Sequence, residues 1–445
     1  MDRRQFLHRT LAIACATTAG ACGSPSSAGN GHAPSPAAES LRALRGTPDW
    51  ETVRAQFDLD HDVVQLGALY IASHPAPVRE AIGRYRRELD RNPVTYLDAE
   101  NRRRRAATLA AAARYLDADA GDIALTDSTT MGLGLVYNGL RLRRGQEILT
   151  TEHDYFATHE AVRVAAARTG AARRRVRLFP DAATVSADAV VDAARRALAP
   201  RTRVLGITWV HSSTGVKLPV ARIAAAVADA NRGRDDDDRV LLVVDGVHGF
   251  GVEDVTADGL GADFLVAGCH KWLFGPRGTG LVWGRPGAWS ATRPTIPSFI
   301  DDATWLAWLH DREPRSPATA ARMTPGGFQP FEHQWAMREA FELHLAIGKA
   351  RVAERTHALA RQLKEGLAGM AHVTLRTPMA DDLSAGIVCF DVDGRSAHAA
   401  VQALRDRGIV ATVTPYAELH VRMAPSIYNT PDDVDRALRA VRALR

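Results

Sequence analysis

The feature that most constrains the fold is an alternation of short, continuous apolar runs with alanine-rich stretches, which begins near residue 105. Strands that are apolar throughout are buried on both faces, and the helices between them supply the cover. The pattern predicts an α/β fold with a mostly parallel sheet, whose ligands bind beyond the carboxyl ends of the strands. The apolar runs are "QEILTTEH" (146–153), "RVRLFP" (175–180), "RVLGITWVH" (203–211), "RVLLVVDGVH" (239–248), "DFLVAGCHK" (263–271) and "GTGLVWG" (278–284).

After about residue 300 the pattern changes to a long helical stretch, a few short apolar runs and a closing helix from Pro431. This arrangement is typical of a smaller α/β domain. We therefore expect an N-terminal segment and large domain over 46–300, followed by a small C-terminal domain over 301–445.

The first 21 residues are typical of an export signal and not of the fold. Arg3 and Arg4 precede a short apolar run and a small-x-small site, Ala19-Gly20-Ala21. The paired arginines resemble the twin-arginine motif, whose route carries folded proteins. The prediction is export to the periplasm; the alternative is a weakly helical N-terminus of a cytoplasmic protein.

Residues 22–45 are poor in apolar side chains and rich in serine, proline and glycine up to residue 40, which predicts a flexible linker. Cys22 directly follows the small residues, so a lipid anchor there is an open alternative, although Ala19 stands where lipoprotein sites usually have leucine. The other cysteines give neither a disulfide framework nor metal-ligand spacing, so no metal site is predicted. A net charge of +5 demands no nucleic acid as a partner.

Two residues just past strand ends carry the predicted chemistry. Lys271 follows "DFLVAG", and a lysine desolvated there would have a lowered pKa and a neutral amine for Schiff-base formation. Asp245 follows "VLLVV", and a buried carboxylate needs a cationic partner such as a protonated pyridine nitrogen. An amine and a carboxylate in these places are what pyridoxal phosphate requires of a protein.

A phosphate seat is predicted at "LTDSTTMGLG", where Ser128, Thr129 and Thr130 begin an apolar helix whose dipole favours an anion. An ordinary N-cap is the alternative for this segment taken alone. A dinucleotide site at Gly132 and Gly134 is excluded, because these glycines lie within the helix and no acidic residue follows at the required distance.

These residues resemble the class V aminotransferases, pyridoxal-phosphate enzymes of fold type I that include cysteine desulfurases and isopenicillin N epimerases. The resemblance covers nearly all of residues 50–445. Its most specific stretches are "VVDGVHGFG", "GCHKWLFGPRGTGLVW" and "RMAPSIYNTPDDVD", and "LYIASHPAPVREAI" and "PGGFQPFEHQWAM" are similar to the epimerase branch.

The resemblance implies pyridoxal 5'-phosphate as cofactor, a homodimer, and a role for each matching residue. Lys271 would hold the cofactor, Asp245 would contact its pyridine nitrogen, and Arg422 would bind the substrate's α-carboxylate. The implied cofactor contacts are His248 near the phenolic oxygen, His153 stacked on the ring, Ser212 beside the ring, and Thr129, Thr130 and His270 at the phosphate.

Three departures from the family pattern stand out. Gly268 replaces a serine that many relatives place near the phosphate, and Gly326 or Gly327 replaces the threonine that a neighbouring subunit lends. The loop "TVTPYAELHVR" lacks the cysteine that desulfurases need, so cysteine desulfuration is predicted to be absent.

The expected function is that of a pyridoxal-phosphate enzyme acting on an amino acid, or on an amine derived from one or from a peptide, by transamination or epimerisation. A lyase, and a catalytically inactive binding protein of the same fold, are the alternatives that the residues leave open.

Overall fold

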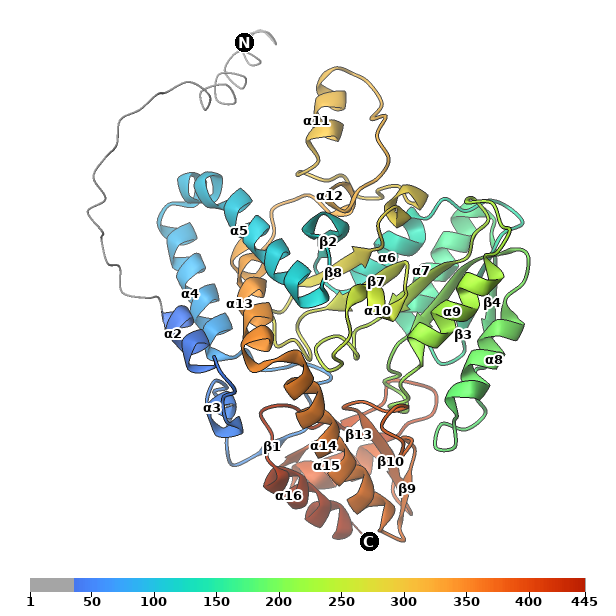
Figure 1. Cartoon of the computed structure of the whole chain (residues 1–445). Coiled ribbons are helices and arrows are strands. Elements are labelled where there is room, and N and C mark those ends of the chain that lie inside the picture. Colours follow the sequence, from blue (N-terminus) through green and yellow to red (C-terminus); the bar gives the residue numbers. More distant parts are fainter. Residues whose placement is uncertain (1–35, 445) are drawn as a thin grey trace. The chain divides into compact units, whose positions relative to one another are not determined.

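The structure, a computed structural model, describes residues 36–444, and its central feature is a seven-stranded sheet (Figure 1). The strand order is β2-β8-β7-β6-β5-β3-β4; β4, β3, β5, β6 and β7 are parallel neighbours, and β8 runs antiparallel to both β7 and β2. The predicted α/β fold with a mostly parallel sheet is therefore confirmed. The strands are β2 (Ile123–Thr126), β3 (Glu147–Thr151), β4 (Ala172–Val176), β5 (Thr202–Thr208), β6 (Leu241–Asp245), β7 (Phe264–Gly268) and β8 (Gly280–Gly284).

Helices cover both faces of the sheet, as the continuous apolar strands require. In β6, Leu242 and Val244 pack into a hydrophobic cluster with α5, α8, α9 and α13, whereas Leu241 and Val243 pack into another with α6 and α7. Successive side chains thus enter opposite cores. These helices are α5 (Pro93–Leu116), α6 (Thr129–Gly139), α7 (Phe156–Thr169), α8 (Ala187–Ala197), α9 (Val220–Ala230) and α13 (Phe331–Ile347), with α4 (Ala76–Arg91), α10 (Ala257–Leu260), α11 (Asp302–Leu309) and α12 (Ala320–Met323) beside them.

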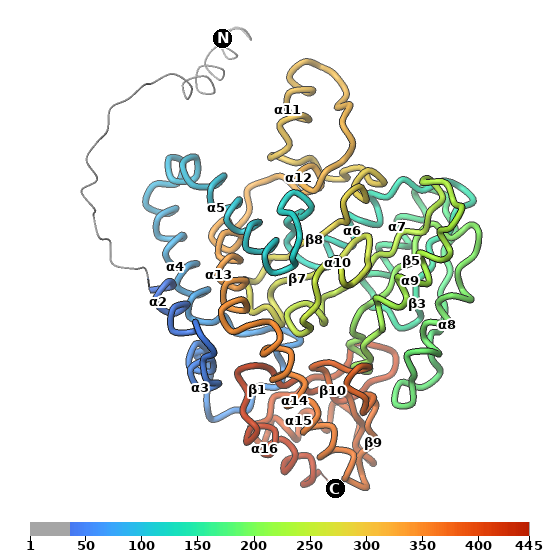
Figure 2. Tube along the Cα trace, in the orientation of Figure 1, coloured from blue at the N-terminus to red at the C-terminus, as the bar shows by residue number. Residues whose placement is uncertain are grey.

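The C-terminal part folds around an antiparallel sheet in the order β12-β13-β10-β9, which shares one hydrophobic core with its three helices. A second, two-stranded sheet pairs β1 (Val64–Gln65) with β11 (Ile409–Val410), and Figure 2 shows β1 beside the C-terminal elements. The N-terminal chain is thus built into the small domain. The remaining elements are β9 (Val373–Leu375), β10 (Val388–Val392), β12 (Thr412–Val413), β13 (Val421–Met423), α14 (Lys349–Ala368), α15 (Ala397–Arg405) and α16 (Pro431–Arg442).

Some expected boundaries differ from those observed. The expected linker contains helix α2 (Pro36–Ala43). This segment is held in place because Ala37 and Leu44 are buried, and α3 (Trp50–Arg54) follows it. Helix α13 packs against α4 and α5, so elements of the large domain extend beyond residue 300. The signal at 1–21, Cys22 and most of the linker lie outside the described residues. No helix among the described residues is long and apolar enough to cross a membrane.

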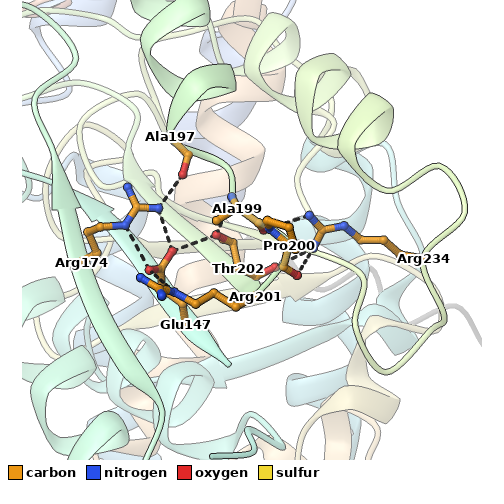
Figure 3. A network of polar contacts seen from close by, with 8 residues as sticks. All are labelled: Glu147, Arg174, Ala197, Ala199, Pro200, Arg201, Thr202 and Arg234. Atoms are coloured by element: carbon orange, nitrogen blue, oxygen red, sulfur yellow. Dashed lines mark hydrogen bonds and ion pairs between the residues drawn. The ribbon is translucent and has the colours of Figure 1, made fainter. Parts of the chain in front are cut away.

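A buried carboxylate ties three strands together at the amino end of the sheet (Figure 3). Glu147 begins β3 and is fully buried; its carboxylate accepts hydrogen bonds from Arg174 Nη2 at 2.8 Å, Arg201 Nε at 3.1 Å and Thr202 Oγ1 at 2.9 Å. Burial alone would raise the pKa of Glu147, but these donors hold that pKa below its usual value. The network is structural, since functional groups of such sheets gather at the opposite end.

Candidate active site

A cavity of about 750 Å³ lies at the carboxyl ends of the strands, between the large-domain sheet and the small domain. It contains most of the site residues predicted from the sequence: Ser212, Asp245, His248, His270, Lys271 and Arg422. It also contains residues that the sequence analysis missed, among them Tyr70, Tyr155, Tyr416 and four side chains of α15. Thr129, Thr130 and His153 are not among the lining residues.

Lys271 is held in a tight turn that follows β7. The amide of Phe274 donates to the carbonyl of Lys271 at 2.9 Å, and the amide of Gly275 donates to the carbonyl of Cys269 at 2.8 Å. Burial lowers the pKa of the Lys271 amine; the carboxylate of Asp245 opposes that shift, and the charge of Arg422 adds to it. The neutral amine is therefore favoured more than in an ordinary lysine, as Schiff-base formation requires.

Asp245 is the last residue of β6 and is 4% exposed. Its Oδ1 accepts a hydrogen bond from the amide of Val247 at 3.1 Å. Burial raises the pKa of this carboxyl, while the Val247 amide and Lys271 lower it. A cation bound next to the Asp245 carboxylate would therefore be strongly favoured.

His248 connects Lys271 to a tryptophan. The indole Nε1 of Trp272 donates to His248 Nδ1 at 3.2 Å, and His248 Nε2 lies 3.4 Å from Lys271 Nζ. An indole N–H can only donate, so Nδ1 carries no proton; burial lowers the pKa of His248, so its single proton sits on Nε2. An Nε2–H group donates to a neutral amine and repels an ammonium. Trp272 thus favours the neutral form of Lys271.

We expect Trp272→Phe to raise the pKa of Lys271, because His248 can then move its proton to Nδ1 and accept from an ammonium group. An ordinary hydrogen bond is worth about 1 kcal/mol, so cofactor rebinding by the cofactor-free protein should slow about three- to ten-fold at neutral pH. The measurement is the rebinding rate as a function of pH. Trp289→Phe is the matched control, since that buried indole donates to the carbonyl of Asp122 at 3.2 Å, away from the cavity. Equal pH profiles for both variants would refute the role given to Trp272.

The predicted phosphate seat contains two buried polar atoms without a hydrogen-bond partner among the described residues, Thr129 Oγ1 and His270 Nδ1. Both lie beside Gly268: a Cβ atom there would be 3.0 Å from Thr129 Oγ1 and 3.2 Å from His270 Nδ1. Gly268 therefore leaves space in which a side chain would crowd both groups. An unpaired hydroxyl at the N-terminus of α6, with an unpaired imidazole nitrogen close to it, fits an anion such as a phosphate.

The other hydroxyls of this segment are placed differently. Ser128 is the N-cap of α6, since its Oγ accepts a hydrogen bond from the amide of Met131 at 3.1 Å. For this residue the alternative, an ordinary N-cap, is therefore correct. Thr130 is exposed in the first turn of the helix. Of the two threonines assigned to the phosphate, Thr129 has the buried, unpaired hydroxyl that the role requires.

Arg422 lies on β13 and is 4% exposed. Its Nε donates to Thr412 Oγ1 at 3.0 Å and its Nη1 to the carbonyl of Ser212 at 3.0 Å. These bonds fix the guanidinium and leave N–H groups on both terminal nitrogens, the arrangement that suits a carboxylate. Ser212 itself is engaged, because its hydroxyl lies 2.9 Å from the hydroxyl of Tyr416.

His153 stacks on Phe179, with ring centroids 3.9 Å apart and an angle of 6° between the planes. Its Nε2 accepts from the amide of Leu178 at 3.3 Å, and burial lowers the pKa of His153 to about 4. The ring is half-buried and lies outside the lining residues, so its stacking on a cofactor remains a prediction. Tyr155, two residues further on, does line the cavity.

Of the departures from the family pattern, Gly268 lies beside the phosphate seat and the loop 412–422 contributes five residues to the cavity lining, whereas the two glycines at 326 and 327 lie elsewhere. Gly326 and Gly327 line a second cavity with Phe299 and Phe328, and their relation to a neighbouring subunit is a prediction from sequence alone. Within the described residues the free cysteines, Cys269 and Cys389, are both buried. No group of three or more potential ligands that could hold a metal ion occurs among residues 36–444.

The fold and the site together define a pyridoxal-phosphate enzyme fold of type I. Residues 72–436 match the family Aminotransferase class-V, so the chain belongs to the class V aminotransferase family. Pyridoxal phosphate is the cofactor of this family, and the similar solved structures include cofactor-bound ones. The unpaired polar atoms of Thr129 and His270 fit the phosphate of that group, and Lys271 and Asp245, which line the cavity, fit its carbonyl carbon and its ring nitrogen.

Among curated relatives, the chain is 28% identical over 412 residues to the isopenicillin N epimerase of Streptomyces clavuligerus, covering 89% of this chain and 98% of the relative. It is 25% identical over 370 residues to a cysteine desulfurase of Klebsiella pneumoniae (strain 342), covering 78% and 84%. A mutant of C-DES with glycine covalently linked to the PLP cofactor superposes with a TM-score of 0.78 at 22% identity, covering 89% of this chain and 99% of the other.

These comparisons support the family and its epimerase-like branch, and they correct one expectation. The exclusion of cysteine desulfuration is not supported, because cysteine desulfurases occur among both the sequence relatives and the similar structures. The absence of a cysteine from one loop is too narrow a basis for excluding a reaction that relatives of similar identity carry out.

Proposed function

We propose that this chain is a pyridoxal-phosphate enzyme that removes the α-proton of an amino acid, or of an amine derived from one or from a peptide, and acts as an epimerase or an aminotransferase. The observation that carries the proposal is the grouping of Lys271, His248, Asp245 and Arg422 in one cavity. The bound cofactor supplies an electron sink for the carbanion left at the α-carbon.

The chain's own residues would divide the work as follows. Arg422 binds the α-carboxylate and orients the α-carbon. Lys271 would hold the cofactor through Nζ, and the same Nζ, when free, would accept and return the α-proton. Asp245 keeps the pyridine nitrogen protonated, and His248 Nε2–H donates toward the phenolic oxygen. Thr129 Oγ1, His270 Nδ1 and the N-terminus of α6 hold the phosphate, with Thr130 at the same helix end.

The fate of the proton separates the reactions that these residues could perform. Return of the proton from Lys271 Nζ to the opposite face of the same carbon would epimerise the substrate, whereas its loss from that carbon would be the route to transamination. The 28% identity to an isopenicillin N epimerase favours epimerisation. Cleavage of a carbon–sulfur bond is the second candidate, favoured by the cysteine desulfurases among the relatives.

The test is incubation of the purified holoenzyme with single enantiomers of amino acids, cysteine and cystine included, in D₂O. We expect deuterium at the α-carbon, with racemisation for an epimerase or with a 2-oxo acid whose formation needs a second 2-oxo acid for an aminotransferase. Sulfide release would instead establish cleavage of the carbon–sulfur bond, by elimination if pyruvate and ammonia accompany it and by desulfuration if alanine does. If the cofactor is bound but no substrate gains deuterium or gives a product, the proposal of an enzyme would be overturned in favour of a binding protein.

Export to the periplasm, a lipid anchor at Cys22 and a homodimer remain predictions from sequence. The first two depend on residues 1–22, which lie outside the described residues, and the third depends on the family resemblance.

A further inference from the structure

Helix α15 presents one face to the cavity that holds Lys271. Its residues His398, Val401, Gln402 and Arg405 line that cavity, at spacings of three, four and seven from the first. Residues at these spacings lie on one side of a helix. The wall contributed by the small domain is therefore mainly polar and ends in a cation.

The cationic end of this wall has no counter-ion among residues 36–444. The side chain of Arg405 is exposed and has no ion pair or hydrogen bond within the described part of the chain. The nearby Asp406 accepts from Gln402 Nε2 at 2.8 Å and is not among the lining residues. An arginine in the last turn of a helix is favoured by the helix dipole, but the dipole does not explain why this arginine lines the cavity.

The charges that line the cavity are unbalanced. Lys271, Arg405 and Arg422 are potential cations, whereas Asp245 is the one carboxylate among the described lining residues, and it is buried at the base. Arg422 has one N–H group left on each terminal nitrogen, enough for a single carboxylate, after its bonds to Thr412 and to the carbonyls of Ser212 and Val413. A substrate with only an α-carboxylate would leave Arg405 without a partner.

We propose that Arg405 binds a second carboxylate, at the end of the substrate's side chain. This inference rests on the proposed function, and it narrows the substrate class to amino acids whose side chain ends in an acid. The acid is either part of the side chain itself or attached to it through an amide, and a cavity of about 750 Å³ accommodates both with the cofactor.

The experiment compares each acid with its neutral amide: glutamate with glutamine, and γ-glutamylglycine with γ-glutamylglycinamide. Binding to the holoenzyme is measured by calorimetry and, in the same samples, by the change in the cofactor's visible absorption. We expect at least one acid to bind about two- to five-fold more tightly than its amide, which corresponds to the contribution of an exposed charge pair. The pair that shows the preference identifies the short or the extended substrate.

Variants of the helix end make the test specific. Arg405→Gln should abolish the preference and Arg405→Lys should keep part of it. Arg407→Gln, which removes a nearby charge whose Nη1 bonds the carbonyl of Ala403 at 2.7 Å outside the cavity, should leave the preference intact. A wild type without any preference, an Arg405→Gln variant that keeps it, or no binding of any ligand would overturn the inference. If the acids bind more tightly than the amides but the cofactor's absorption does not change, Arg405 still binds the second carboxylate, but the ligand does not react with the cofactor and the proposed function is refuted.

Discussion

Lys271→Ala is expected to remove the visible absorption of the lysine-bound cofactor and to lower turnover by at least about 10³-fold, since it removes both the attachment point and the group that moves the proton. Of the described residues that line the cavity, Lys271 alone carries a primary amine. A neighbouring side chain therefore cannot replace it. The measurement is the absorption spectrum after reconstitution with pyridoxal phosphate, followed by turnover of the best substrate.

The fold should survive this substitution, because burying an ionisable amine costs free energy that alanine does not. The melting temperature of the cofactor-free variant should thus equal or exceed that of the cofactor-free wild type. Lys217→Ala is the matched control: this half-buried lysine pairs with Glu253 at 2.9 Å outside the cavity, and its removal should leave the absorption band unchanged. A Lys271→Ala protein that retains the band would show that another amine binds the cofactor.

The sheet and the strand-end residues could be predicted from sequence because burial on both faces leaves a continuous apolar signal. Strand β6 is such a run, and it delivers Asp245 to the cavity. Strand β4, one of the two edge strands, gave no such signal: it covers Ala172–Val176, where the three arginines at 173–175 are half-buried or exposed, and the predicted run at 175–180 therefore lay too far along the chain.

The contacts that refine the site could not be predicted because they join segments far apart in the sequence. Trp272 is adjacent to Lys271, but its effect depends on a hydrogen bond to His248 that only the folded turn creates. Helix α15 reaches the cavity more than a hundred residues after Lys271, and nothing in its own sequence marks Arg405 as different from a solvated helix end. Composition likewise predicted a linker where Leu44 is fully buried.

Asp245→Asn is expected to separate cofactor binding from catalysis. The amide oxygen of asparagine can still accept from the Val247 amide, so the local structure is preserved, but a neutral side chain cannot keep a pyridine nitrogen protonated. Without a protonated ring the carbanion is poorly delocalised, and turnover should fall about 10²- to 10⁴-fold. The visible band of the bound cofactor should remain.

Asp245→Asn should lower turnover but should favour cofactor binding by Lys271. These opposite effects distinguish a catalytic role of Asp245 from damage to the fold. The Asp245 carboxylate raises the pKa of Lys271, so its removal lowers that pKa and increases the neutral fraction of the amine at a given pH. The cofactor-free variant should therefore rebind the cofactor at an undiminished rate down to a lower pH than the wild type does, while its turnover falls. Asp263→Asn is the matched control, because that carboxylate accepts from the Leu242 amide at 2.7 Å and does not line the cavity; it should leave both measurements unchanged. Wild-type turnover in Asp245→Asn, or slower rebinding together with slower turnover, would contradict the assignment of Asp245 to the ring nitrogen.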